Sequence, residues 1–421
     1  MVARLLATPP PESAPEYYEE LAARQPGVRV AFTKRKGKSL VATKAFAPGD
    51  LILAEPPLAA AQDPHNARVV LACQHCFRIL GPSLEAHIGR ALRAMHEDPE
   101  LVPSDSENES EDWSDEEGPG CSQGQTPDAL PSQEIASALI KGHLRMESDA
   151  EAQSPAPVWG DSGSAYCSAS CRDAAWADYE GVLCRDAAAA DDFASFVEAT
   201  NPAFAVVARF IASTVSDAMR LMQESNKSPE EALLEAWRPV AWGQKALWWE
   251  LPVADEDADD AAEYLCAMVP DARFAALCDA RVIGSLLGMI ELNNLALVVA
   301  SPAHAWVNSR DGGGAAAGPS ASALSDLARF VRRRGRTLDV DGTGFYRLHS
   351  CCNHSCVPNA HAFKRPEDDR GDAVVLALRT IETGDEITLS YIDEEAPFEE
   401  RRAALMEYLF ECDCPKCQAR Q

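Results

Sequence analysis

The stretch GFYRLHSCCNHSCVPN, residues 344–359, decides the fold of this 421-residue chain. A second stretch, GDEITLSYID, follows at residues 384–393. The Asn-His-Ser-Cys sequence in the first stretch would, by itself, be compatible with a polar turn stabilised by Pro358. Its combination with the second stretch and with three closely spaced cysteines near the end of the chain is much more specific. These cysteines are Cys412, Cys414 and Cys417.

The cysteine spacing predicts metal binding. The chain has 14 cysteines, and two further close pairs occur as Cys73-x2-Cys76 and Cys167-x3-Cys171. The first twenty residues have no apolar run long enough for a secretory signal, so we expect an intracellular protein. Close thiol pairs in a reducing compartment favour zinc over disulfides.

Charge and hydropathy limit the partners. Lys plus Arg is 38 and Asp plus Glu is 66, which gives a formal charge of −28. Such a charge argues against tracking a nucleic-acid backbone and favours a basic partner. No stretch reaches the roughly 18 uninterrupted apolar residues of a membrane helix. The best candidate, residues 286–300, is interrupted by Glu291, Asn293 and Asn294.

The chain divides by composition. Short β-branched and apolar runs between residues 28 and 60 predict hairpins. Acidic, Ser-rich and Gly-rich residues between about 97 and 133 predict a disordered insertion. Apolar residues three and four apart over 190–310 predict a helical module. A Gly- and Ala-rich linker at 311–322 leads through an arginine-rich helix to a β-rich block at 340–392.

The motifs resemble those of a SET domain closed by a post-SET zinc clasp. The resemblance is carried by Asn353 to Cys356 with Pro358-Asn359, by residues 384–391, and by Tyr408-Leu409-Phe410-x-Cys412-x-Cys414-x2-Cys417. The cysteine-rich segment inside the SET fold resembles the SET and MYND group of lysine methyltransferases. Within that group, LNNLALVVASP, CCNHSCVPNAHAFKR and YIDEEAPFEERR are similar to the plant trithorax-related branch.

The resemblance implies an α+β fold: small SET sheets with a pseudoknot, a partial MYND-like zinc insert, a helical SET insert and a post-SET clasp. We therefore divide the chain into an N-terminal tail (1–27), the first part of SET (28–72), the MYND-like segment with its acidic insertion (73–184), the helical insert (190–310), the linker (311–322), the core SET (323–395) and the clasp (396–421).

The implied activity is transfer of a methyl group from S-adenosylmethionine to a lysine amine. The amine must be neutral, and with a pKa of about 10.4 its deprotonation at pH 7 costs about 4.6 kcal/mol. An apolar, aromatic channel would favour the neutral amine. By resemblance, Tyr391 is the tyrosine at the transfer point, and Tyr346 is a second candidate for the channel, with ordinary core packing as the alternative for each.

The resemblance also implies the cofactor residues. The match for the first hairpin is Gly37-Lys38, and the matches for the pocket are Asn293, Asn353, His354 and Phe410, with Asn294 as the rival of Asn293. The family usually has Gly-x-Gly in the hairpin, because glycine allows close backbone approach. This chain has Ser39 at the second glycine, which puts cofactor affinity in doubt.

About two zinc ions are expected. Cys356 with Cys412, Cys414 and Cys417 would complete a structural site of four cysteines. Cys73, Cys76, Cys167 and Cys171 resemble the first and third ligand pairs of a MYND finger. The ligands of a second MYND zinc would fall near Trp159, Ser162, Glu180 and Cys184, of which only the last is a typical zinc ligand there. We predict that this second MYND zinc is absent.

The resemblance and the charge together predict a basic protein substrate, in the first place a histone tail, and a nuclear location with the cytoplasm as a second one. The alternatives are a non-histone substrate and an inactive SET and zinc scaffold, which Ser39 and the missing zinc favour. The resemblance further implies that the MYND-like part can serve as an interaction module for a proline-rich or transcription-factor partner, whereas direct nucleic-acid contact is disfavoured.

Overall fold

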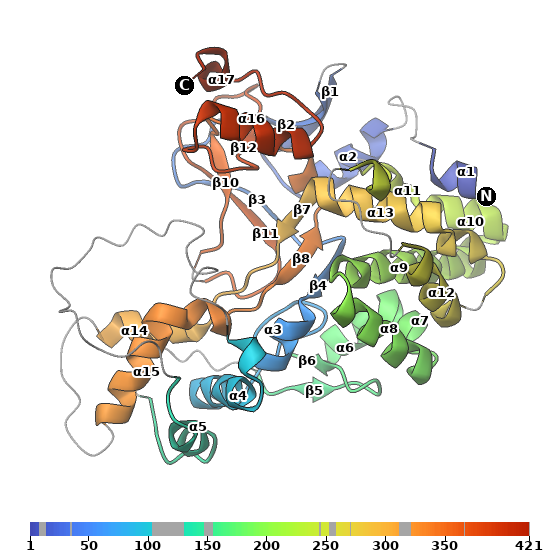
Figure 1. The fold of residues 1–421 in the computed structure, drawn as a ribbon. Helices are drawn as coiled ribbons and strands as arrows, with labels where there is room; N and C mark the ends of the chain where they lie inside the picture. Colours follow the sequence, from blue (N-terminus) through green and yellow to red (C-terminus); the bar gives the residue numbers. More distant parts are fainter. Residues whose placement is uncertain are drawn as a thin grey trace.

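A computed structural model describes residues 1–7, 14–33, 36–102, 130–146, 155–243, 246–251, 258–269, 271–310, 321–365 and 367–420. Its small β-sheets run through the centre of the molecule, with helices gathered around them (Figure 1). The helical insert, α8 to α13, lies on one side of the strands, and the C-terminal helices lie above them in this view.

The predicted hairpin is present at the start of the fold. Strand β1 (Val28–Thr33) pairs antiparallel with β2 (Gly37–Ala42), from Val28 opposite Ala42 to Thr33 opposite Gly37. Gly37 has a φ of +67°, which a residue with a side chain rarely adopts. Its role in the turn therefore requires glycine, apart from any cofactor.

Two three-stranded sheets join the beginning of the chain to its C-terminal third. One has the order β10 (Ala360–Ala362), β11 (Ala373–Ala377), β3 (Leu51–Glu55). The other has the order β4 (Ala59–Gln62), β8 (Gly342–Phe345), β7 (Asn294–Ala296). The intervening zinc segment and helices are therefore insertions into one β-fold.

The two diagnostic stretches lie side by side. Strand β9 (Asn353–His354) pairs in parallel with β12 (Thr388–Leu389), with His354 opposite Leu389. The backbone N–H of Ser355 continues the pairing by donating to the Leu389 carbonyl at 2.9 Å. This pairing connects the Asn-His-Ser-Cys motif to the residues that lead into Tyr391. The pseudoknot stays a prediction.

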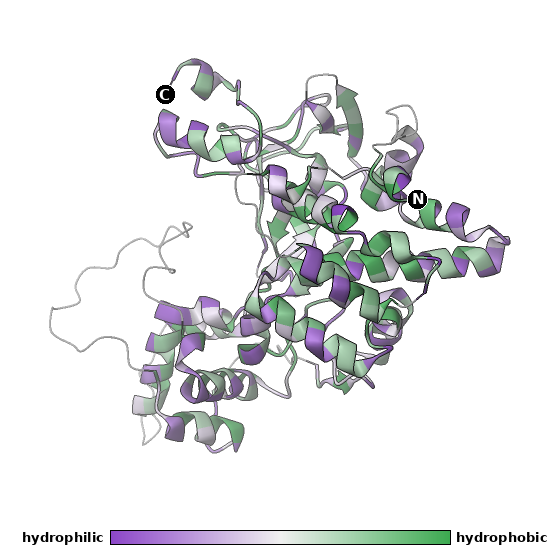
Figure 2. Ribbon diagram, turned by 45° about the vertical axis from the view of Figure 1, so that its right-hand side comes forward, coloured by the Kyte–Doolittle hydropathy of each residue, from purple (hydrophilic) through white to green (hydrophobic). Residues whose placement is uncertain are grey.

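The helical insert consists of amphipathic helices packed around a shared apolar core. Figure 2 shows hydrophobic and hydrophilic residues on most of its helices. The core includes Phe204, Ile211, Trp237 and Leu286, which are almost fully buried. The helices are α8 (Ala187–Ala199), α9 (Ala203–Ser225), α10 (Pro229–Ala236), α11 (Arg238–Ala241), α12 (Ala258–Met268) and α13 (Ala280–Asn293).

One element of the predicted helical module is a strand. The chain leaves α13 at Asn293 and forms β7 at once, because Leu295 and its neighbours pair with β8. Tertiary pairing thus overrides the apolar run that predicted a helix. Four further helices share a second core on the other side of the sheets, with Ile88, Trp306 and Leu327 buried among them. They are α4 (Leu84–Glu97), α5 (Gln133–Ile140), α14 (Pro302–Arg310) and α15 (Ala321–Arg334).

The predicted acidic insertion falls mostly outside the described residues, at 103–129, and most of the predicted linker does so at 311–320. At the start of the predicted insertion, where the sequence predicts disorder, Pro99–Leu101 instead forms a single 3-10 turn whose Leu101 is buried. The remaining α-helices and strands are α1 (Val2–Leu5), α2 (Ala14–Ala22), α3 (Pro64–Val69), β5 (Val158–Trp159), β6 (Ala165–Tyr166), α6 (Ala169–Ala175), α7 (Gly181–Leu183), α16 (Phe398–Glu407) and α17 (Pro415–Gln418).

Glu55, at the end of β3, holds the turn that precedes the diagnostic motif. Its carboxylate accepts the backbone N–H of Leu348 at 2.8 Å and of His349 at 2.6 Å. Burial raises the pKa of Glu55 from 4.5 to about 7, and the backbone donors and the Arg347 charge only partly offset this. The ionised carboxylate is therefore costly in the folded protein.

We predict that Glu55→Gln changes the pH dependence of stability. The raised folded pKa stabilises the native state at low pH, and this contribution, about 3 kcal/mol, disappears as pH rises from 4.5 through about 7. Glutamine keeps the acceptor oxygen without the charge. In thermal unfolding, the variant should gain melting temperature relative to wild type at pH 8 but not at pH 4.5. The exposed Glu382→Gln is the control, and a difference between Glu55→Gln and wild type that does not vary with pH would count against the account.

Candidate active site and zinc centres

Tyr391 lies at the centre of an aromatic cluster. Its ring centroid is 5.2 Å from that of Tyr408, 5.4 Å from His354 and 6.3 Å from Phe410. Its hydroxyl donates to the carbonyl of Cys352. Burial raises the pKa of Tyr391 well above its ordinary range, so the phenol is protonated at neutral pH. Tyr391 can therefore orient a ligand by hydrogen bonding, but it is not a strong base.

His354 connects this tyrosine to the cysteine cluster of the clasp. Its Nδ1 accepts the backbone N–H of Tyr391 at 3.0 Å, which places the proton of a neutral imidazole on Nε2. Nε2 lies 3.2 Å from the sulfur of Cys356. Burial, helped by the charge of Arg401, lowers the pKa of His354 to about 4, so the ring is neutral at physiological pH.

The four clasp cysteines lie together. The sulfurs of Cys356, Cys412, Cys414 and Cys417 are all within 4.8 Å of one another, and Cys356 Sγ is 3.5 Å from Cys417 Sγ. Tetrahedral zinc with Zn–S bonds of about 2.3 Å separates its sulfurs by about 3.8 Å. A disulfide requires about 2.05 Å. The four thiols therefore fit a zinc ion, as the sequence predicts.

The MYND-like cysteines form a second quartet of the same kind. Cys76 Sγ is 3.5 Å from Cys167 Sγ, which is 3.4 Å from Cys171 Sγ, and Cys73 completes the group within 4.8 Å. Three of the residues predicted near the second MYND zinc also lie together. Ser162 donates a hydrogen bond to the carboxylate of Glu180, as does the neighbouring Tyr166, and Cys184 hydrogen-bonds with Ser162. The side chain of Trp159, the remaining predicted position, is exposed to solvent. The absence of that zinc stays a prediction.

Asn353 connects the motif to the first hairpin. Its side-chain N–H₂ faces the Lys38 carbonyl at 2.9 Å, the Ser39 hydroxyl at 2.9 Å and Glu386 Oε1 at 2.7 Å. Lys36 Nζ contacts the other oxygen of Glu386 at 2.6 Å. Although burial opposes it, the donors around Glu386 lower its pKa, so it is a carboxylate. Ser39, the departure from the family pattern, is thus a buried member of this network.

The other predicted cofactor residues make separate contacts. Lys38 Nζ donates to the Trp242 carbonyl at 2.7 Å, and burial lowers its pKa. Asn293 donates to the Met289 carbonyl of its own helix at 3.0 Å. Phe410 is half-buried beside His354, at 6.0 Å between centroids. Tyr408 and Glu386 belong to the site although sequence reasoning gave them no role. In the sequence, Tyr408 is marked only by its place two residues before Phe410, and Glu386 only by its place in the Gly-Asp-Glu turn.

Tyr346 lies in a different environment from Tyr391. It is almost fully buried, and its hydroxyl donates to the Gly371 carbonyl at 2.6 Å. The Gly371 N–H donates to the carbonyl of Cys76 at 2.9 Å, which connects Tyr346 to the MYND-like cysteines. A Cβ at Gly371 would lie 2.6 Å from a Phe77 ring carbon, so only glycine fits. Among the described residues, no ring contact joins Tyr346 to Tyr391.

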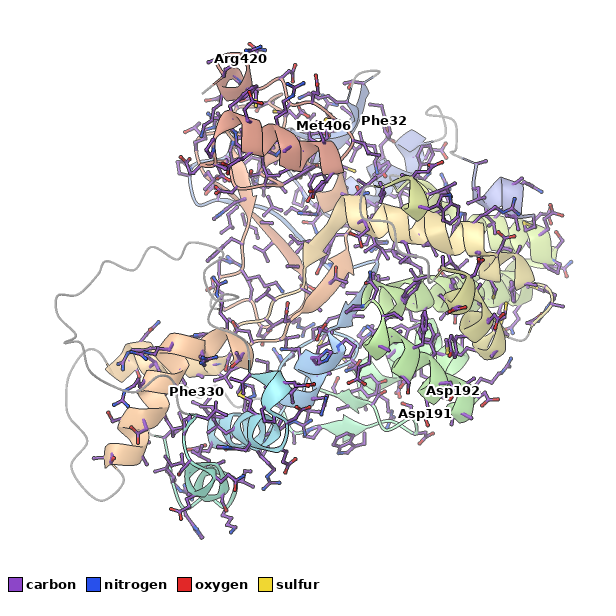
Figure 3. The ribbon with its side chains drawn as sticks, in the orientation of Figure 1. Phe32, Asp191, Asp192, Phe330, Met406 and Arg420 are labelled. Carbon is purple, nitrogen blue, oxygen red and sulfur yellow. The ribbon has the colours of Figure 1, made fainter. Side chains whose placement is uncertain are left out.

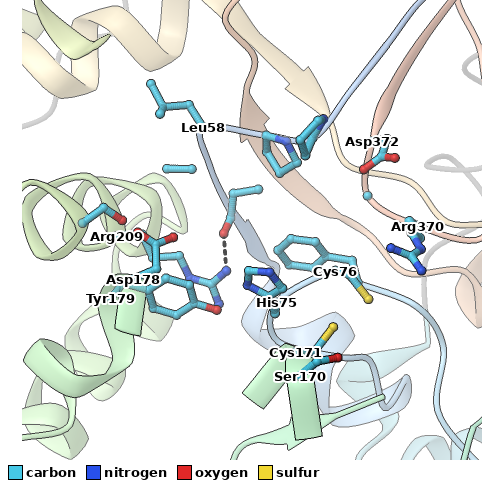
Figure 4. Close-up of a pocket in the computed structure, with 17 residues that line it drawn as sticks. Leu58, His75, Cys76, Ser170, Cys171, Asp178, Tyr179, Arg209, Arg370 and Asp372 are labelled. Carbon is cyan, nitrogen blue, oxygen red and sulfur yellow. Dashed lines mark hydrogen bonds between the residues drawn. The ribbon is translucent and has the colours of Figure 1, made fainter. Parts of the chain in front are cut away.

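A cavity of about 310 Å³ opens beside this connection (Figure 4). It lies between the MYND-like segment, helix α9 and the chain around Gly371. Arg209 lines the cavity. Its guanidinium donates to the Ala60 carbonyl at 2.5 Å and lies over the ring of Tyr179, 4.6 Å from the ring centroid. The cavity therefore lies at the boundary between the zinc segment and the SET sheets.

The fold and the site define a SET-domain protein. The family model of the SET domain matches residues 37–392, so the chain belongs to this family. Its relatives include histone-lysine N-methyltransferase ATXR2 of Arabidopsis thaliana, which is 32% identical over 463 aligned residues covering 99% of this chain and 96% of the relative. Protein-lysine N-trimethyltransferase SMYD5 of Gallus gallus is 26% identical, over 91% of this chain and 84% of the relative.

A shorter match confirms the SET and MYND resemblance. Histone-lysine N-methyltransferase SMYD3 of Mus musculus is 43% identical over 79 residues, which cover 18% of this chain and 17% of the relative. The predicted likeness to the plant branch is confirmed by the match along the whole chain. In the described part of the chain, no helix has the length and apolar character needed to span a bilayer.

We predict two zinc ions per chain, one for each cysteine quartet. Cys417→Ser should remove one and Cys73→Ser the other, because a closed structural site needs all four thiolates. Elemental analysis of the purified variants measures this directly. Cys266, which is exposed and lies outside both quartets, supplies the control Cys266→Ser, which should keep both ions. Retention of two zincs by either quartet variant would contradict the assignment.

Proposed function

We propose that this protein is an S-adenosylmethionine-dependent protein-lysine N-methyltransferase that acts on a basic tail, in the first place a histone tail. The observation that carries the proposal is the aromatic cluster around Tyr391, which is bound through His354 to the Asn-His-Ser-Cys motif. Family membership and the names of the relatives support the reaction class.

The cofactor supplies, when bound, a methyl group activated on a sulfonium. The half-buried ring of Phe410 leaves part of its surface open to a stacking partner, and backbone groups of the Asn353–His354 strand remain beside it. These residues fit an adenine and its polar attachments. Gly37, Lys38 and Asn293 would complete the binding residues, with Lys38 and Asn353 already held by hydrogen bonds.

Tyr391 has the chemistry to prepare the lysine amine. Its hydroxyl proton is used on the Cys352 carbonyl, so the oxygen lone pairs can accept an N–H from an incoming amine and fix its direction. The rings of Tyr408 and Phe410 make the surroundings apolar, which disfavours an ammonium and favours the neutral, nucleophilic form. Orientation and desolvation are the main requirements of this displacement. Tyr346, which follows β8 and donates its hydroxyl to the Gly371 carbonyl, is proposed to shape the channel from that side.

The substrate class follows from charge. The formal charge of −28 would steer a lysine-rich tail toward the enzyme. A histone tail implies a nuclear location, and a basic non-histone protein is the alternative. The exposed Trp159 and Trp176 on the zinc segment offer a surface for a proline-rich or transcription-factor partner.

One observation favours a second function, an inactive scaffold. Ser39 stands where the family pattern has glycine, so its side chain occupies space that the cofactor's approach normally uses. The structure argues against a lost pocket, because this side chain is turned into the hydrogen bond with Asn353 at 2.9 Å. Calorimetric titration with S-adenosylmethionine separates the two functions: measurable binding supports the enzyme, and none supports the scaffold.

Tyr391→Phe should lower kcat for methyl transfer by about a hundredfold or more, because the amine loses the group that orients it. The measurement is transfer of a labelled methyl to a histone mixture at saturating cofactor. Tyr264→Phe, remote on α12, is the control and should retain activity. A Tyr391→Phe enzyme that keeps its zinc and its full rate would exclude this role.

Turnover on a histone-tail peptide should also depend on salt. Steering by surface charge weakens as the screening length falls from about 14 Å to about 6 Å between about 0.05 M and 0.3 M salt. We expect kcat/KM to fall steeply over this range while kcat changes little. A peptide with its non-target lysines replaced by glutamine is the control and should lose most of the dependence. Equal salt profiles for both peptides would reject steering.

A further inference from the structure

Arg401 is buried where a charged residue is unusual. It lies on α16 with 1% of its surface exposed, among the largest fully buried side chains. Its neighbour Arg402 has 55% of its side chain exposed and pairs with Glu411 at 3.0 Å. The two adjacent arginines thus have opposite environments, although nothing in the sequence FEERRAALME separates them.

The contacts of Arg401 explain its burial. Its guanidinium hydrogen-bonds to the sulfurs of Cys356 and Cys417, and its Nη1 donates to the Ala396 carbonyl. Cys356 comes from the Asn-His-Ser-Cys motif and Cys417 from the C-terminal tail. The side chain therefore joins three segments: the motif, the tail and the start of α16.

The contacts of Arg401 would compensate the negative charge of a zinc-bound cysteine quartet. Four thiolates around Zn²⁺ carry a formal charge of 2−, and burying such a charge is costly unless donors and an opposite charge surround it. A guanidinium offers both, with several N–H groups in a planar fork. His354 adds a further donor to Cys356, at 3.2 Å from Nε2.

We propose that Arg401 is a positioning residue that keeps the clasp zinc bound and the clasp closed. Outer donors of this kind orient metal ligands and retain the metal. The same contacts reach the aromatic cluster, because Cys356 contacts His354 and His354 accepts the N–H of Tyr391 at 3.0 Å. Loss of Arg401 would loosen the clasp first and the setting of Tyr391 second. The inference concerns zinc retention and goes beyond methyl transfer.

The test measures zinc release from the full chain to a coloured chelator, for wild type, Arg401→Met, Arg401→Lys and the control Arg402→Met. Methionine keeps an apolar stem without charge or donors, whereas lysine keeps the charge and can donate to one sulfur. We expect one of the two zincs to leave about tenfold faster or more in Arg401→Met. Arg401→Lys should be intermediate, and Arg402→Met should match wild type.

Mass spectrometry after brief thiol alkylation identifies the site. The faster labelling should appear at Cys412, Cys414 and Cys417, while Cys73 and Cys76 stay at the wild-type rate. Wild-type release from Arg401→Met, or faster loss of both zincs together, would overturn the proposal, since the second result indicates general unfolding. If Arg401→Met does not fold, Arg401→Lys decides: wild-type zinc release from it overturns the proposal.

A spectroscopic readout separates donation to sulfur from simple packing. With Co²⁺ in place of zinc, loss of N–H donors to the thiolates should shift the sulfur-to-cobalt absorption band in Arg401→Met, and lysine should restore part of the shift. An unchanged band in Arg401→Met would overturn the proposal. None of these measurements needs cofactor or substrate, so their outcome is independent of whether the chain methylates a protein.

Discussion

The parallel pairing of β9 with β12 is the interaction on which the site depends. It is only two residues long on each strand, yet it places His354 opposite Leu389 and so brings the Tyr391 N–H within 3.0 Å of the imidazole. Parallel strands cannot be joined by a tight turn. The chain from Ala360 to Ala377 therefore forms the β10–β11 pair between them, which also carries Gly371 to the MYND-like cysteines. One short pairing thus sets the geometry of the aromatic cluster, and the connection between its strands positions the Gly371 carbonyl that binds Tyr346.

The sequence was most informative where local spacing carries the chemistry. Both cysteine quartets were predictable, including the distant Cys356, because a closed zinc site needs four ligands and the motif supplies the missing one. The hairpin β1–β2 was predictable from the short β-branched and apolar runs between residues 28 and 60. The strand at Asn294–Ala296 could not be predicted, because a short apolar run is compatible both with a helix and with a strand that pairs with a distant part of the chain. Strand β8 is that partner, and it begins 46 residues after β7 ends.

The residues that escaped prediction are mainly polar groups whose partners come from elsewhere. Glu55 looks like any acid at a strand end, and its burial against two backbone N–H groups arises only when the turn at Leu348 folds over it. Arg401 likewise follows two glutamates in a strongly polar helix, where no apolar stripe marks its face. Buried charged groups are set by tertiary contacts, so a single sequence reveals them poorly. They are informative once found, because each occurs where backbone N–H groups or cysteine sulfurs supply the compensating hydrogen bonds or charge.

The two cysteine quartets connect to different tyrosines. The MYND-like quartet holds Cys76, whose carbonyl binds the Gly371 N–H, and Gly371 in turn accepts the Tyr346 hydroxyl. The clasp quartet holds Cys356, which reaches Tyr391 through His354. In the first connection, the link between Cys76 and Gly371 is made by backbone groups and tolerates side-chain changes as long as residue 371 is glycine. The link to Tyr346 needs the hydroxyl of that side chain. The second depends on the imidazole and the guanidinium themselves. The clasp quartet is therefore connected to the aromatic cluster through a side chain, the imidazole of His354.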